Sequence, residues 1–266
     1  MDKLKFTILG CGSSGGVPRL GSNWGACDPA NPKNRRLRCS MLVQRVGLNG
    51  TTNLLIDTTP DMRQQLLAAD IGQLDAVIYT HEHADHLHGL DDLRMVVLNS
   101  GKRLSVYAAD YTRRAVLDRF GYAFETPKGS DYPPILEMHP LTAATQIKGN
   151  GGPIDITSFD VKHGRIYVSA LKINNLLYTP DISAIFEGSE HQFKGLDYWI
   201  IDALRMRDHP SHFSLNDALH NIEKYNPKQA VLTNMHIDLD YDTVKGTTPD
   251  NVTPAFDMMQ IEMDIA

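Results

Sequence analysis

The chain has 266 residues, of which 42% are hydrophobic and 22% are charged, and its formal net charge is −6. This composition is that of a globular protein with an apolar core, and it argues against a disordered chain or a general binder of polyanions. Three cysteines are too few for a disulfide framework, which favours a reducing compartment. No signal peptide and no apolar run of the roughly 20 residues that cross a membrane is recognisable. We therefore expect a cytoplasmic protein with no membrane partner.

Short apolar runs separated by turns dominate the first part of the chain. Residues 4–9 predict a strand that enters a glycine-rich loop at 10–16. The apolar runs at 41–46 and 53–56 flank a turn-prone cluster of glycine and asparagine, which is typical of a hairpin. Residues 60–69 begin with proline and aspartate and have apolar side chains at helical spacing, so they predict a helix.

The rest of the chain mixes strands and helices in the same way. Residues 76–80 predict a strand buried on both faces, and 89–98 predict a helix. Several prolines and glycines indicate a long loop or insertion at 127–153. Further strands are predicted at 104–108, 154–161, 166–172, 175–179, 198–201 and 230–233, and further helices at 110–120, 182–187 and 214–225. Because no linker interrupts this series, residues 1–266 are predicted to form a single domain.

Eleven histidines occur in the chain, and four of them lie within residues 81–88. The segment THEHADHLHG directly follows a predicted buried strand, so its side chains lie at a sheet edge, where functional sites are common. Imidazole and carboxylate groups are ligands of zinc and related metals. His81 and His83 can converge on one ion, and Asp85 and His86 on a second one, as in two-metal hydrolases. The alternative, a loop of ordinary polar residues, accounts poorly for this density of histidines.

The same segment resembles the H-x-H-x-D-H motif of the metallo-β-lactamase superfamily. That resemblance implies a fold of the α/β (α+β) class, an αββα sandwich of two mixed β-sheets flanked by helices. It also implies a third histidine after a later strand, which ITSFDVKHG supplies as His163, and a bridging aspartate, which LLYTPDIS supplies as Asp181. Related sequences carry L-T-H after the final strand, where this chain has Asn234. His236, two residues on, faces the same way along an extended chain and is predicted as the last metal ligand, with Asn234 as the alternative.

Four further segments resemble the PhnP-type phosphodiesterases, which are relatives of tRNase Z: GCGSSGGVPRLG, KNRRLRCS, LLIDTTPDMRQQL and DHPSHFSLNDAL. This resemblance implies hydrolysis of a small phosphodiester, such as a cyclic ribosyl or nucleotide phosphodiester. It implies that His212 contacts the phosphate or protonates the leaving oxygen, for which imidazole has a suitable pKa. His209 and Arg205 are further candidates for binding the substrate, and a solvated surface position is the alternative for each of them.

The sequence departs from this branch in two places. PhnP-type proteins can carry a cysteine-rich structural zinc site, but here only Cys27 and Cys39 lie in the corresponding region, so we do not predict a third metal. The arm with which tRNase Z grips tRNA is not evident, and the chain is acidic. A nucleic-acid partner is therefore not expected, and the partner is predicted to be a small phosphodiester or nucleotide.

The predicted mechanism is metal-assisted hydrolysis with two divalent ions, zinc or manganese. Asp85 would bind one ion and orient the attacking water, and His212 would protonate the leaving alkoxide. Two alternatives stay open: a thioester- or lactam-type hydrolase on the same metal site, and a nucleotide- or metal-binding module with reduced catalysis. The sequence leaves open which phosphodiester is the natural substrate, which metal is bound, and whether the chain forms a homodimer.

Overall fold

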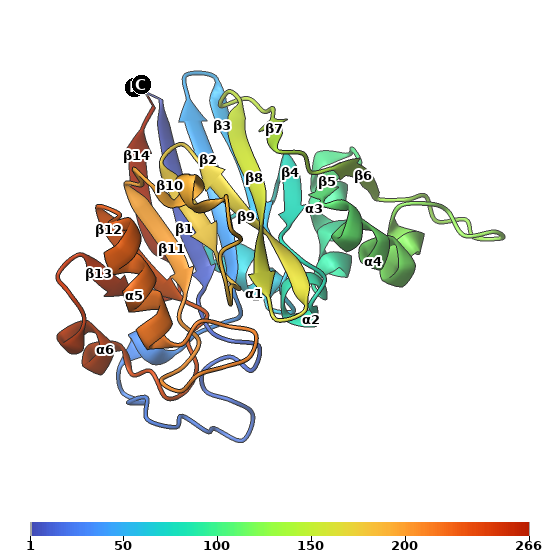
Figure 1. The fold of residues 1–266 in the computed structure, drawn as a ribbon. Coiled ribbons are helices and arrows are strands. Elements are labelled where there is room, and N and C mark those ends of the chain that lie inside the picture. Colours follow the sequence, from blue (N-terminus) through green and yellow to red (C-terminus); the bar gives the residue numbers. More distant parts are fainter. Residues whose placement is uncertain (1, 266) are drawn as a thin grey trace. The chain divides into compact units, whose positions relative to one another are not determined.

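Two mixed β-sheets of seven strands each, accompanied by helices, form the computed structural model, which describes residues 2–265 (Figure 1). The fold class predicted from the sequence is confirmed in these elements. The chain divides into two compact units. Unit 1 comprises Met1–Leu9, Ser40–Ile156 and Gln260–Ala266, and unit 2 comprises Gly10–Cys39 and Thr157–Met259. The prediction that residues 1–266 act as one domain stays a prediction.

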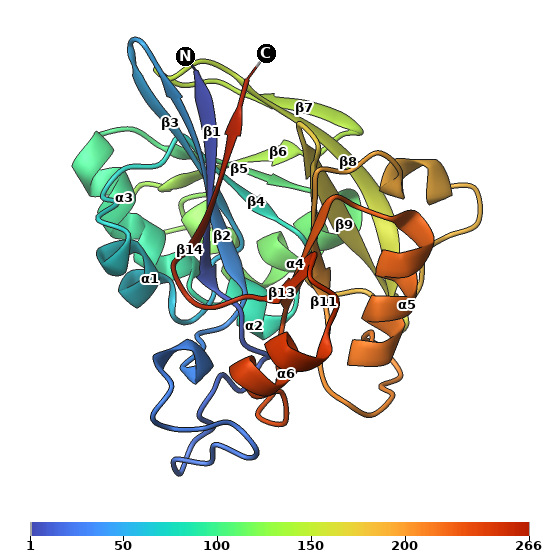
Figure 2. The ribbon, with the colours of Figure 1, turned by 90° about the vertical axis from the view of Figure 1, so that its left-hand side faces the viewer.

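The sheet of unit 1 has the strand order β14–β1–β2–β3–β4–β5–β6. Its strands are β1 (Lys3–Gly10), β2 (Ser40–Gly47), β3 (Gly50–Ile56), β4 (Ala76–Tyr79), β5 (Leu104–Ala108), β6 (Leu136–Pro140) and β14 (Met259–Asp264). β2 and β3 form the predicted antiparallel hairpin, and β3 to β6 pair in parallel. Both views show β14 beside β1, at the two ends of the chain (Figures 1 and 2).

The helices of unit 1 connect its parallel strands. They are α1 (Met62–Ala68), α2 (Ala84–Leu87), α3 (Leu93–Ser100) and α4 (Asp110–Phe120), with 3₁₀ turns at Leu90–Asp92 and Gly121–Ala123. The predicted helix at 89–98 is therefore a 3₁₀ turn followed by α3. Helix α3 ends at Gly101, whose φ of 68° lies in the left-handed region that favours glycine at a helix end.

The second sheet has the strand order β13–β12–β11–β10–β9–β8–β7. Its strands are β7 (Ala144–Ile147), β8 (Ile154–His163), β9 (Ile166–Ile173), β10 (Leu176–Thr179), β11 (Tyr198–Asp202), β12 (Gln229–Thr233) and β13 (Val252–Pro254). β9 and β10 pair antiparallel, and β10 to β13 pair in parallel. Unit 2 also contains α5 (Leu215–Tyr225), α6 (Tyr241–Thr247) and 3₁₀ turns at Pro32–Asn34 and Glu190–Phe193.

The start of α5 lies where the sequence predicts it. The Ser214 side chain accepts a hydrogen bond from the backbone N–H of Asp217, and the Asp217 carboxylate accepts one from the backbone N–H of Ser214. This reciprocal capping box satisfies two N–H groups that the helix itself leaves unpaired. Apolar side chains at helical spacing, such as Leu215 and Ile222, are buried. The cap fixes the chain immediately after His212.

Two expectations about secondary structure are wrong. Residues 182–187 form no helix, because the Ile182 N–H donates to the Asp202 carboxylate and Ala184 forms an antiparallel bridge with Lys162. The region 127–153 is more than a loop, since it contains β6 and β7. In the part of the chain that the structure describes, no helix has the length and apolarity needed to cross a membrane.

In each unit, parallel strands deliver polar residues to a common edge. In unit 1, Asp57 follows β3 and His81 follows β4 after one residue. In unit 2, Asp181 follows β10, Asp202 ends β11 and Asn234 follows β12. Because the carboxyl ends of neighbouring parallel strands lie together, side chains far apart in the sequence meet there.

Candidate functional site

Asp57 organises the histidine motif in unit 1. Its fully buried carboxylate accepts hydrogen bonds from the Thr80 N–H (2.8 Å), the Thr80 hydroxyl (2.7 Å) and His86 Nδ1 (2.7 Å). Burial raises the pKa of Asp57, and the hydrogen bonds from His86 and Thr80 oppose that rise. The backbone of Asp57 has a φ of 63°, a left-handed conformation in which aspartate is tolerated better than most residues.

These hydrogen bonds determine the tautomers of two predicted metal ligands. A carboxylate only accepts, so His86 carries its proton on Nδ1 and has its lone pair on Nε2. The Thr80 hydroxyl donates to Asp57 and so accepts from His81 Nδ1 at 3.0 Å, which gives His81 the same tautomer. An imidazole held through Nδ1 by an oxygen, with its lone pair on Nε2, is the form in which histidine binds metal ions.

The other two predicted ligands of the motif lie beside these histidines. The ring centroids of His81 and His83 are 4.7 Å apart, and those of His81 and His86 are 4.3 Å apart. The Asp85 carboxylate lies 3.8 Å from His86 Nε2. His81 and His86 are buried, whereas His83 is exposed and Asp85 is partly exposed. Strand β4 and the short helix α2 thus gather all four predicted ligands of THEHADHLHG within unit 1.

Unit 2 places the next two predicted ligands together. His163 ends β8 and Asp181 follows β10, and His163 Nε2 lies 3.6 Å from an Asp181 carboxylate oxygen. His163 Nδ1 donates to the backbone carbonyl of Ser211, so its lone pair is also on Nε2. The two chain segments approach closely, because a Cβ at Gly164 would stand 2.8 Å from Ser211 Cβ. Both predicted ligands are buried.

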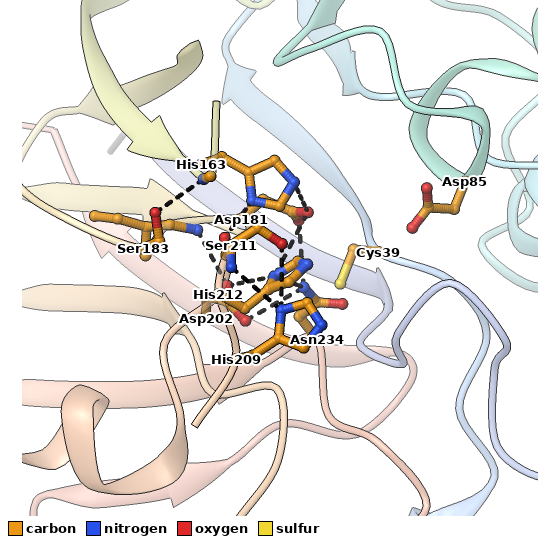
Figure 3. Close-up of polar contacts among 12 residues, drawn as sticks. Cys39, Asp85, His163, Asp181, Ser183, Asp202, His209, Ser211, His212 and Asn234 are labelled. Carbon is orange, nitrogen blue, oxygen red and sulfur yellow. Dashed lines mark hydrogen bonds and ion pairs between the residues drawn. The ribbon is translucent and has the colours of Figure 1, made fainter. Parts of the chain in front are cut away.

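Asp202 holds His212 in the same unit. Its carboxylate accepts from His212 Nδ1 at 2.8 Å, from the Ile182 N–H at 3.0 Å and from the Asn234 side-chain amide at 3.2 Å (Figure 3). Burial raises the pKa of Asp202 to about 7, and the hydrogen bond from His212 opposes the rise. The Asn234 amide also lies 3.4 Å from the Asp181 carboxylate, and the φ of Asn234 is 60°. Asn234 therefore bridges two buried carboxylates.

His209 and Arg205 lie on the loop between β11 and α5. The ring centroids of His209 and His212 are 5.0 Å apart, and His209 Nδ1 accepts from the Ser211 N–H and hydroxyl. Burial lowers the pKa of His209, and the positive charges of His212 and Arg205 lower it further. The Arg205 guanidinium donates to the backbone carbonyls of Arg207 and Asp208. The structure thus places His209 beside His212 and holds Arg205 by its own loop.

His236 makes contacts that differ from those of the other predicted ligands. Its Nδ1 lies 2.9 Å from the Asp238 carboxylate, and its Nε2 accepts from the Arg19 guanidinium. Burial lowers the pKa of His236, as does the charge of Arg19, whereas Asp238 raises it. Its role as a metal ligand stays a prediction, and so does the alternative in which Asn234 fills that position.

Three residues that bind predicted site histidines were not predicted from the sequence. Asp57 and Asp202 each stand at the carboxyl end of an apolar run, which is a signal that could have drawn attention to them. Arg19 follows the glycine-rich loop at 10–16 and carries no comparable signal. Cys27 and Cys39, whose roles the sequence left open, are buried, and neither belongs to a disulfide.

The side chains fit a divalent metal ion in their chemistry. In unit 1 the His81 and His83 side chains offer two imidazoles, and in unit 2 the His163 and Asp181 side chains offer an imidazole and a carboxylate. Nitrogen and carboxylate donors of this kind suit zinc and other first-row ions. His81, His86 and His163 are each held through Nδ1 by an oxygen acceptor, as metal ligands are.

Comparison with known families identifies the chain. The model of the β-lactamase superfamily domain matches residues 52–237. The chain belongs to the β-lactamase superfamily. This match includes the histidine motif of unit 1 and the His163, Asp181 and Asn234 positions of unit 2, and it confirms the resemblance on which the sequence prediction was based.

Relatives support membership in the branch that contains PhnP. A diphosphatase from the PhnP family is 33% identical, with a TM-score of 0.87 over 99% of this chain and 98% of the other. The short form of human tRNase Z shares the fold, with 17% identity and a TM-score of 0.63 over 98% of this chain and all of the other. An octanoyltransferase from Porphyromonas gingivalis is 31% identical over 87% of this chain. The chain spans only 46% of the length of that protein.

Proposed function

We propose that the chain is a metal-dependent phosphodiesterase that hydrolyses a small ribosyl or nucleotide phosphodiester. One observation carries the proposal: three buried histidines each bind an oxygen acceptor through Nδ1, which prepares Nε2 for a metal ion. The superfamily consists mostly of hydrolases, and a relative at 33% identity is a diphosphatase of the PhnP family. The first finding favours hydrolysis, and the second favours a substrate that is attacked at phosphorus.

The proposed metal ligands are those predicted from the sequence. The ions would be held by His81, His83, Asp85, His86, His163 and Asp181, with His236 or Asn234 as the last position. Two divalent ions, zinc or manganese, would supply Lewis acidity and a nucleophile at neutral pH when bound. Asp85, whose side chain is partly exposed, would also orient the attacking water.

His212 is the proposed proton donor to the leaving oxygen. Asp202 binds His212 Nδ1, so Nε2 is the ring atom from which a proton can pass to the substrate. The buried carboxylate orients the ring and stabilises its protonated form, as a carboxylate does for a catalytic histidine. His209, which packs against His212, and Arg205 would contact the phosphate.

The decisive experiment combines metal analysis with a substrate panel. The purified protein, loaded with zinc or with manganese, is assayed on bis-p-nitrophenyl phosphate, cyclic nucleotides and a ribosyl cyclic phosphate, and bound metal is counted. We expect two ions per chain, and activity that His81→Ala and Asp85→Asn abolish. His220→Ala is the matched control, because His220 is exposed on α5. Full activity in both site variants would refute the proposal.

Acyl substrates form a second arm of the same panel. The relative named octanoyltransferase is the observation that favours this alternative, a thioester- or lactam-type hydrolase. Turnover of thioesters that does not depend on His212 would replace the phosphodiesterase proposal. A chain that binds at most one ion and turns over neither class would instead be a binding module with reduced catalysis.

The remaining parts of the proposal concern the setting of the enzyme. We propose a small phosphodiester or nucleotide as the substrate, a cytoplasmic location, and no nucleic-acid or membrane partner. A homodimer is left open. Fractionation of cells and light scattering of the purified protein test the location and the oligomeric state.

A further inference from the structure

The Arg19 side chain is held in a defined position within unit 2. Its backbone forms an antiparallel bridge with Asn23, closed by hydrogen bonds of 2.9 and 3.2 Å. The side chain lies across Gly15, where a Cβ would stand 3.3 Å from Arg19 Cγ. The next residue, Leu20, is fully exposed, so the hairpin presents Arg19 at a surface while its own side chain is half-buried.

His236 is the partner of Arg19, and its loop is fixed independently. The fully buried Arg36 donates to the backbone carbonyls of His236 (3.4 Å) and Leu239 (2.8 Å). A guanidinium only donates, so His236 Nε2 accepts from Arg19 while Nδ1 faces the Asp238 carboxylate. A lone pair that accepts an Arg19 hydrogen bond is not available to a metal ion at the same time.

Three imidazole rings, those of His163, His212 and His209, form a row in unit 2. This row begins at a predicted metal ligand and leads to the segments that carry Arg19 and His236. The ring centroids of His163 and His212 lie 4.5 Å apart, and those of His212 and His209 lie 5.0 Å apart (Figure 3). The loop that carries His209 and Arg205 is joined to the His236 segment, because the His236 N–H donates to the Leu204 carbonyl at 2.8 Å and the Met206 N–H donates to the Asp238 carboxylate at 3.3 Å. The two joined segments bring two guanidinium groups to this part of unit 2: Arg19 contacts His236, and Arg205 precedes Met206 on the loop that bonds to Asp238. The Asp238 carboxylate is bound to His236 and to the Met206 N–H.

We propose that Arg19, oriented by His236, binds a second phosphate group of the substrate, beyond the phosphate that is attacked. The inference rests on the proposed function and narrows its substrate class to esters of diphosphates, such as nucleoside diphosphate derivatives. The planar guanidinium offers two parallel N–H donors that match two phosphate oxygens. Arg205 precedes Met206, whose N–H donates to the Asp238 carboxylate beside His236, and would add positive charge to the same group. His236 acts as a positioning residue and not as a metal ligand.

Binding of two nucleotides that differ by one phosphate tests this subsite. The affinities of AMP and of α,β-methylene-ADP, which resists hydrolysis, are measured by titration calorimetry on the metal-loaded protein. We expect the diphosphate to bind at least about tenfold more tightly, because it gains charge-assisted hydrogen bonds. Arg19→Met should remove this preference and leave AMP affinity within about twofold, and Arg19→Lys should keep part of it. Arg63→Met, at an exposed position of α1, is the control and should change neither affinity.

The role of His236 has its own readout in metal content. His236→Gln should weaken diphosphate binding and retain the same number of ions per chain as the unmodified protein. Loss of an ion from His236→Gln would show that His236 is a metal ligand and would overturn its positioning role. An equal diphosphate preference in the Arg19→Met variant and the unmodified protein would overturn the subsite itself. If the protein prefers the diphosphate over AMP, and this preference depends on Arg19, the subsite is supported even when the protein hydrolyses no phosphodiester. That result would reject only the proposed reaction.

Discussion

Replacement of Asp57 tests the hydrogen bonds that hold two predicted metal ligands in unit 1. The fully buried carboxylate accepts from the Thr80 N–H, the Thr80 hydroxyl and His86 Nδ1, all within 2.8 Å. Asp57→Ala leaves three buried donors without this acceptor, and a buried donor left unsatisfied costs about 1–3 kcal/mol. Because neighbouring contributions are not additive, we expect the free energy of unfolding to fall by about 3–5 kcal/mol.

Two further variants separate hydrogen bonding from backbone strain. Alanine at the Asp57 φ of 63° adds about 1 kcal/mol of strain, which asparagine largely avoids. Asp70→Ala is the matched control, because Asp70 is exposed and has a φ of 54°. It therefore carries the same backbone cost without the buried hydrogen bonds. Asp57→Asn should lose less stability than Asp57→Ala, but it should still place an amide N–H against a donor.

Urea unfolding of the metal-free protein measures the stability, and competition with a chromophoric chelator measures the metal affinity. Loss of the group that orients a ligand lowers metal affinity by roughly 10–100-fold, so both Asp57 variants should bind zinc more weakly. If the free energy of unfolding of Asp57→Asn is within about 0.5 kcal/mol of that of the unmodified protein, and zinc affinity is equal, the proposed role of Asp57 is wrong.

Three other predictions concern residues of unit 2. Burial raises the pKa of Asp257 to about 7, above its value near 4 in the unfolded chain. The folded state therefore binds an extra proton, and the free energy of unfolding should fall by up to about 4 kcal/mol as the pH rises from 4 to 8. Asp257→Asn should flatten this part of the pH dependence of urea unfolding, and an unchanged profile would contradict it. Asp202→Asn should lower kcat about 100-fold with little change in KM, because Asp202 orients His212 through a hydrogen bond to Nδ1. An unaltered kcat would show that Asp202 does not act on His212 in this way. Gly25→Ala would place a Cβ 2.4 Å from the Ile237 carbonyl oxygen, at a φ of 59°. The free energy of unfolding, measured by thermal unfolding, should therefore fall by about 2–3 kcal/mol. A melting temperature equal to that of the unmodified protein would refute this prediction.

The elements predicted from the sequence are those with strong local signals. The hairpin of β2 and β3 follows from two apolar runs around a turn, and α5 follows from Ser214 and Asp217 and the helical spacing after them. Residues 182–187 show the limit of such signals. Their apolar spacing is compatible with a helix, but hydrogen bonds to Asp202 and Lys162, distant in sequence, hold them extended.

The sequence by itself determined the histidine motif after β4, because the density of donors in THEHADHLHG needs no tertiary information. Resemblance to a known family then pointed to His163 and Asp181. Only the tertiary structure showed Asp57 and Asp202, since each becomes a partner of a histidine through the side-by-side carboxyl ends of parallel strands. The pairing of Arg19 with His236 was likewise invisible, because it joins residues 217 positions apart. Local patterns report on chemistry within a few residues, whereas a hydrogen bond between strands depends on how the sheet orders them.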